Sequence, residues 1–196
     1  MISTTLKKLK LISGSTLAKI FDDLYNDILT IPYTSASTFI KKLWERYNPA
    51  SPSTNGSVFE GLIATVLYKS KILPLYLQAE ISFVPNVKFD FVAYAKTCGP
   101  IVLAAKTSLR ERYKQADLEG MMLRQVHRKA KRFLITLNEE EARNVNKKIK
   151  QGKVLGLDRV VVMDYSFDDL ICELQNHEYI IPNKIPVIKS QRLVTL

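Results

Sequence analysis

The sequence predicts an α/β fold, a central mixed β-sheet flanked by helices and preceded by an N-terminal helical part. Short apolar runs of strand length alternate with charged segments of helical period, an order that favours helices on both faces of a sheet. Residues 48–57 are rich in Pro, Ser and Asn and predict a loop between the first helices and the rest. With 196 residues, 46% of them hydrophobic, we expect a single domain, 1–196.

The first predicted elements are helical. Residues 19–29 and 35–47 have helical character, and Pro32 separates them. Ser57 then serves as the predicted N-cap of a helix over residues 58–69. Glu60 falls along or beside the apolar stripe of this helix, so a carboxylate is expected next to the buried face.

Three strands follow; Asp90 lies within the second, and Lys106 directly follows the third. Residues 75–84 and 87–96 predict a pair of strands, and the alternation in the second places Asp90 on the face opposite its phenylalanines. After a turn, a third strand over residues 101–105 leads directly into Lys106.

The remainder alternates helices and strands. Ser108 and Glu111 fit a capping box, so a helix is expected from Ser108 to about Ala130. The later predictions are a strand at 132–137, a helix at 138–152, a buried strand at 159–165, a helix from Ser166 and an extended tail after His177.

The charge balance and the cysteines restrict the class of protein. The formal net charge of +10 favours polyanionic partners, with nucleic acid first. Cys98 and Cys172 form no CxxC pair, so neither a disulfide framework nor a zinc site is expected. No signal-peptide core and no window near roughly 20 apolar residues is present. We therefore expect a cytoplasmic protein.

Asp90 and Lys106 are the most informative pair of residues. Aspartate is depleted in strands, and a turn between the two strands would bring its carboxylate and the lysine to the same end of a hairpin. The pair is either a structural ion pair or a metal ligand beside a group that orients water on a phosphate. Arg112, Gln115 and Glu119, spaced i, i+3, i+7, share one face of the next helix.

An acid on one strand followed by an acid-x-Lys on the next is the signature of PD-(D/E)xK nucleases. The stretch KTSLRERYKQADLE, with the residues around it from 57 to 165, resembles the catalytic core of type II restriction endonucleases. The resemblance implies a restriction-endonuclease-like core after the helical part of residues 1–50. Two positions depart from the pattern: Ala104 stands where the second strand acid is usual, and Phe89 replaces the proline before Asp90.

The resemblance also implies the chemistry. In one subgroup the missing acid comes from the helix about 13 residues after the lysine, which here is Glu119. Glu80, Glu111 and Asp117 remain alternatives for that role. Asp90, Glu119 and Glu60 are then the expected catalytic Mg²⁺ ligands, because Mg²⁺ takes oxygen donors, and Lys106 holds the attacking water. The expected DNA or phosphate contacts are Arg110, Arg112, Gln115 and Arg128.

The expected activity is Mg²⁺-dependent endonuclease cleavage of double-stranded DNA in a bacterial or archaeal cytoplasm. Little of the chain is left to recognise a DNA sequence, and it is similar to the strand-cleaving small subunits of heterodimeric type IIS enzymes, whose larger subunit recognises the site. A stand-alone homodimeric type II enzyme, a structure-specific nuclease and a nonenzymatic DNA-binding module are the alternatives.

Overall fold

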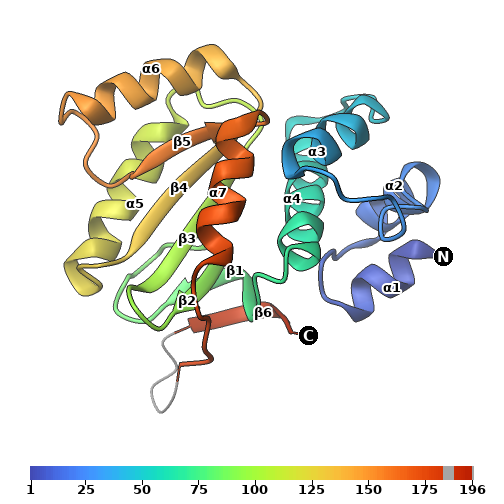
Figure 1. The fold of residues 1–196 in the computed structure, drawn as a ribbon, viewed down its shortest axis with the longest axis horizontal. Coiled ribbons are helices and arrows are strands. Elements are labelled where there is room, and N and C mark those ends of the chain that lie inside the picture. The colour runs from blue at the N-terminus through green and yellow to red at the C-terminus, as the bar shows by residue number, and fades with distance from the viewer. Residues whose placement is uncertain (183–187, 196) are drawn as a thin grey trace.

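The computed structural model describes residues 1–182 and 188–195, and it confirms the α/β fold class. A six-stranded mixed sheet runs through the centre in the order β5-β4-β3-β2-β1-β6, and helices flank it (Figure 1). The strands are β1 (Leu75–Ile81), β2 (Phe89–Ala95), β3 (Gly99–Lys106), β4 (Lys131–Thr136), β5 (Arg159–Val162) and β6 (Ile188–Val194). The helices are α1 (Ile2–Lys8), α2 (Ser15–Leu24), α3 (Ala36–Glu45), α4 (Pro52–Lys69), α5 (Arg112–Val126), α6 (Glu139–Lys150) and α7 (Tyr165–Gln175).

The sheet joins an antiparallel half to a parallel half. β1, β2 and β3 pair antiparallel through short connections, whereas β3, β4 and β5 are parallel and are linked by α5 and α6. Parallel neighbours require such crossover connections. The predicted extended tail includes β6, which pairs antiparallel with β1 and forms one edge of the sheet.

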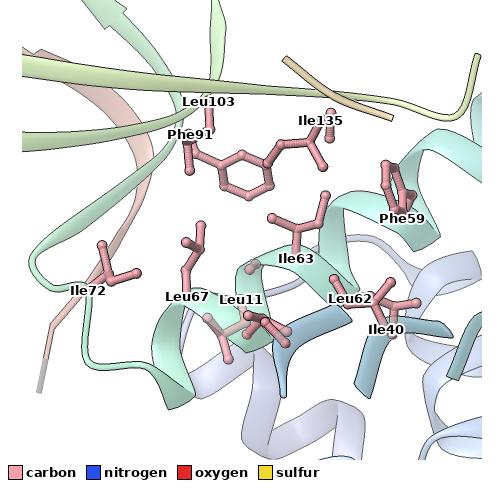
Figure 2. Packing of buried hydrophobic residues seen from close by; sticks show 14 of the residues in the cluster. Leu11, Ile40, Phe59, Leu62, Ile63, Leu67, Ile72, Phe91, Leu103 and Ile135 are labelled. Carbon is pink, nitrogen blue, oxygen red and sulfur yellow. The ribbon is translucent and has the colours of Figure 1, made fainter. Parts of the chain in front are cut away.

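The two faces of the sheet are covered by different helices. The largest core cluster contains residues of α4 and α7 together with sheet residues, and it also includes residues of α1–α3. Figure 2 shows Ile63 and Leu67 of α4 directed toward Phe91, Leu103 and Ile135 of the sheet. α5 and α6 pack against the opposite face. Among the described residues, no helix is long and apolar enough to cross a membrane.

α4 begins earlier than the sequence predicts. Ser51, not Ser57, is its N-cap, since the Ser51 side chain accepts a hydrogen bond from the Thr54 backbone N–H. Pro52 occupies the first turn, where its missing N–H does no harm. The prediction of a loop over residues 48–57 was wrong in its second half, because a serine-proline pair also starts helices.

α5 begins later than predicted, at Arg112, and the capping box is absent. The N-cap Glu111 makes no side-chain cap hydrogen bond and pairs instead with Lys114. The carboxylate of Glu141, at the start of α6, accepts from the backbone N–H groups of Leu109 and Arg110. A carboxylate distant in sequence thus binds the segment that was predicted to form the first turn of this helix.

The alternation of β2 differs from the prediction at its first residue. Phe91 belongs to the core cluster beneath α4, but Phe89 lies in the cluster that contains Leu123 of α5. The cause is an irregularity in the neighbouring strand: Leu77 pairs with Phe91 and Ala79 with Phe89, while Gln78 between them has φ 51°. Asp90 lies opposite this irregular residue and so is not confined to one face.

Candidate active site

Asp90 and Lys106 meet at the open end of the β2–β3 hairpin. The Lys106 Nζ donates to Asp90 Oδ2 at 2.9 Å, and the Ala105 backbone N–H donates to the same oxygen at 2.9 Å. The Asp90 side chain is 11% exposed and the Lys106 side chain 31% exposed. The predicted juxtaposition is therefore present, and the acid is held by two donors at the margin of the core.

Glu60 of α4 is a second carboxylate on the side of the sheet that α4 covers. Its carboxylate accepts a hydrogen bond from Gln78 Nε2 at 2.9 Å. Burial and, next, the negative charge of Asp90 raise the pKa of Glu60 to about 7, while Lys106, Arg192 and the hydrogen bond from Gln78 oppose the rise. Glu60 and Asp90 thus form an electrostatically coupled pair of acids.

A cleft of about 670 Å³ opens over this pair. Its walls come from the start of α2, the first half of α4, and strands β1, β2 and β6. The polar residues that line it are Ser13, Ser15, Thr16, Ser53, Thr54, Ser57, Glu60, Gln78, Asp90 and Arg192. The N-terminal helical part therefore contributes directly to the space in front of the two acids.

Glu119 lies on the other side of the sheet, in a pocket of about 70 Å³ that also contains Asp90, Lys106 and Ala104. Its carboxylate accepts from Arg132 Nη2 at 2.5 Å and from Gln115 Nε2 at 2.8 Å. The Arg132 side chain is only 2% exposed, and burial lowers its pKa. Glu119 is thus the counter-charge of a buried arginine, in the space that the small Ala104 leaves open.

The three predicted metal ligands do not gather into one cluster. Asp90 borders both the large cleft and the small pocket, whereas Glu60 borders only the first and Glu119 only the second. Throughout residues 1–182 and 188–195, no group of three or more His, Cys, Asp or Glu side chains is placed to hold a metal ion. The carboxylate pair of the cleft, Asp90 with Glu60, fits a cation that takes one or two carboxylates and keeps waters and substrate oxygens, as Mg²⁺ does.

The predicted phosphate contacts divide into two groups. Arg112 and Gln115 line the small pocket beside Asp90. Arg110 is exposed on the loop before α5 and lines neither pocket. Arg128 is exposed on the loop that precedes β4, near the end of that strand where Lys131 pairs with Ile101 rather than with Lys106. Arg128 therefore lies at the far end of the sheet from the two acids.

The alternative acids have other contacts. Asp117 accepts from the backbone N–H groups of Leu155 and Gly156, which ties the α6–β5 connection to α5. Glu111 pairs with Lys114. Glu80 is exposed and borders the hollow of the β1–β2 connection, away from the cleft.

Three residues of the site were missed by sequence reasoning. Arg132 was predicted as the first residue of a strand, but its side chain is buried beneath Glu119. Arg192 reaches the cleft because β6 pairs with β1, and burial lowers its pKa while Glu60 opposes that change. Gln78 carries no sequence signal at all, since only its backbone conformation and its contact with Glu60 distinguish it.

Comparisons with protein-family models, with curated proteins and with solved structures find no match to this chain.

Proposed function

We propose that this protein is a Mg²⁺-dependent endonuclease that hydrolyses phosphodiester bonds of double-stranded DNA. The observation that carries the proposal is the Asp90–Lys106 pair at 2.9 Å, whose acid, Asp90, also lines a cleft together with a second acid, Glu60. Phosphodiester hydrolysis needs charge neutralisation at the phosphate and a water aligned with the leaving oxygen. A buried acid pair with an adjacent lysine supplies groups for both.

The charged residues in and beside the cleft have different roles in the proposed reaction. Asp90 and Glu60 hold the divalent cation, which supplies Lewis-acid stabilisation of the phosphate when bound. The Lys106 ammonium, with three donors, orients the attacking water and stabilises charge on the phosphate. Arg192 in the cleft provides a planar fork for a phosphate oxygen pair. The net charge of +10 attracts the DNA backbone.

We further propose that the chain cuts one strand beside a larger subunit that recognises the DNA site. Exposed apolar side chains support a protein partner. Leu118, Met121, Met122 and Val126 of α5, together with Leu155 of the following connection, are between 37% and 63% exposed. Apolar side chains gathered on one surface are typical of contacts with another protein.

The test uses supercoiled plasmid, Mg²⁺ and the purified chain, alone and with candidate larger subunits. We expect nicked circles only when the matching partner is present, and we expect Asp90→Ala and Lys106→Ala to abolish nicking. Lys96→Ala is the matched control, because Lys96 is an exposed lysine that pairs with Glu178 at the turn end of the same hairpin.

Other outcomes would replace the proposal. Linear product at a defined site from the chain alone would indicate a homodimeric type II enzyme. Preferential cutting of branched DNA would indicate a structure-specific nuclease. DNA binding that survives Lys106→Ala, without metal-dependent cleavage under any partner condition, would indicate a nonenzymatic module.

A further inference from the structure

Gln78 has a backbone conformation that its place in the sheet does not explain. It is the central residue of β1, yet its φ is 51°, in the left-handed region that non-glycine residues rarely adopt. The other described non-glycine residues with positive φ are Lys10, Lys71, Phe83, Asn86 and Arg110, and all of them lie in turns. Such outliers inside regular structure persist where the surroundings enforce them, often at functional sites.

The unusual backbone changes the direction of the Gln78 side chain. In a regular strand, residue 78 would share a face with Tyr76, which packs in the cluster that contains Leu123 of α5. Instead the Gln78 carboxamide reaches the α4 side and donates to Glu60 at 2.9 Å. The register places Gln78 opposite Asp90, since Leu77 pairs with Phe91 and Ala79 with Phe89. Gln78 therefore adjoins both acids of the cleft.

The donor that Gln78 offers to Glu60 is uncharged. A carboxamide is a neutral donor, so it orients the Glu60 carboxylate without cancelling its charge. On the other face of the sheet, Glu119 is bound by the buried guanidinium of Arg132, which does cancel its charge. Of the two carboxylates beside Asp90, only Glu119 is neutralised by the donor that holds it.

We propose that Gln78 is a positioning residue: its strained backbone directs its carboxamide at Glu60 and holds that carboxylate beside Asp90, so that the two acids bind one divalent cation. The proposal rests on the proposed function. It assigns to Gln78 no contact with the cation, because residues that orient ligands act through the ligands they bind.

The experiment measures Mn²⁺ binding to the full chain without DNA or partner, by calorimetry and by electron paramagnetic resonance, together with the melting temperature. Gln78→Gly removes the carboxamide and relieves the backbone strain. We expect it to keep or raise the melting temperature and to weaken Mn²⁺ binding by about 10- to 100-fold, the range for residues that orient metal ligands. If the hydrogen bond served only the stability of the fold, its loss would lower the melting temperature and would not weaken Mn²⁺ binding selectively.

Two further variants keep the test decisive. Gln78→Asn preserves a carboxamide and tolerates left-handed backbone, but it is one methylene too short to reach Glu60, so we expect a similar loss of Mn²⁺ affinity. Lys71→Gly is the matched control, because Lys71 has φ 59° in the turn after α4 and is exposed. It reports the net effect of relieved strain and added chain entropy, and we expect unchanged Mn²⁺ binding.

The outcomes separate this inference from the proposed function. If the wild-type chain binds Mn²⁺ and Glu60→Gln weakens binding, but Gln78→Gly and Gln78→Asn bind as the wild type does, the positioning role is overturned while the metal site stands. If Gln78→Gly unfolds the chain, Gln78→Asn alone decides. If the wild-type chain binds no Mn²⁺, or Asp90→Asn leaves binding unchanged, the metal site itself is overturned, and the role of Gln78 with it.

Discussion

Two carboxylates flank Asp90, Glu60 on the α4 side and Glu119 on the α5 side, and their surroundings differ in kind. Glu60 opens on a cleft of about 670 Å³, is held by a neutral amide, and has a pKa raised to about 7 by burial and by Asp90. Glu119 borders a pocket of about 70 Å³ and pairs with a buried arginine at 2.5 Å. The donor that holds Glu60 is a neutral amide, whereas the donor that holds Glu119 is a charged guanidinium.

This difference indicates which acid is suited to catalysis. A carboxylate that already neutralises a buried guanidinium cannot leave it without exposing an uncompensated charge in the core. A carboxylate whose neighbour is another carboxylate gains from any cation that enters between them. We therefore propose different roles for the two carboxylates: Glu60 binds the cation, and Glu119 stabilises the fold.

The sharpest test of the comparison exchanges each acid for its amide. We expect Glu60→Gln to lower cleavage on the order of 1000-fold, equivalent to about 4 kcal/mol, because loss of a direct ligand should exceed the roughly 100-fold effect of an indirect one. Glu119→Gln should lower cleavage far less. Plasmid nicking by the reconstituted complex at saturating Mg²⁺ provides the measurement, and equal losses from the two variants would end the distinction.

Glu119→Gln should instead reduce stability. Arg132 then remains buried without its charged partner, and we expect a loss of about 3 kcal/mol in the free energy of unfolding, measured in urea. The control is the double variant Glu119→Gln with Arg132→Met, which removes both charges and should recover most of the loss. A single variant as stable as the wild type would show that the pair is not structural.

The raised pKa of Glu60 predicts how stability depends on pH. The folded state keeps the Glu60 proton up to about pH 7, while the unfolded chain releases it near its ordinary value of 4.5. The folded state binds more protons in this window, so stability falls as pH rises through it, by up to about 3 kcal/mol. Glu60→Gln should therefore be more stable than the wild type at pH 8 but not at pH 4.

Urea unfolding at the two pH values, with and without Mg²⁺, tests this pH dependence. Mg²⁺ at pH 8 should stabilise the wild type and not Glu60→Gln, since a ligand of the folded state shifts the equilibrium. Glu178→Gln, a change at an exposed carboxylate outside the cleft, should leave the pH profile unaltered. Identical pH profiles for the wild type and Glu60→Gln between pH 4 and 8 would contradict the raised pKa of Glu60.

The smallest expected effect concerns the helix that carries Glu60. Ser51→Ala removes the cap of α4 and should lower stability by about 1 kcal/mol. Ser57→Ala alters the residue that the sequence predicted as the cap, and we expect little change. Thermal unfolding of the two variants measures the difference, and the reverse order would place the start of α4 at Ser57.

Much of the fold was predictable because its signals are local. The apolar runs of β2, β3 and β4, the turn between β2 and β3 and the helical segment between β3 and β4 predict a mixed sheet. The residue types at Asp90 and Lys106 and the turn between their strands predict their approach. The start of α5 was not predictable in the same way, since the group that binds the preceding loop is Glu141, about 30 residues further along the chain. Capping rules describe only neighbours in sequence.

The candidate site was predicted only in part, because some of its contacts join residues that are distant in sequence. Glu60 was placed near the core from its helical stripe, and it does adjoin Asp90. Counting residues after Lys106 led to Glu119, but the spacing along a helix cannot reveal that a buried Arg132 from the next strand binds that acid. Arg192 reaches the cleft only because β6 pairs with β1, and Gln78 reaches Glu60 only because its backbone has a positive φ. Neither the strand pairing nor the dihedral angle has a signature in composition or periodicity.

The edge strand β6 links the C-terminal segment to the chemistry of the cleft. It pairs with β1 along residues 188–194 and brings Arg192 to the acids. Removing it would strip a cation from the cleft and leave the backbone of β1, whose Leu75 and Leu77 are buried, as an unprotected sheet edge open to pairing with other chains. We therefore expect a chain shortened at this end to aggregate more readily and to lack the guanidinium that Arg192 contributes to the cleft.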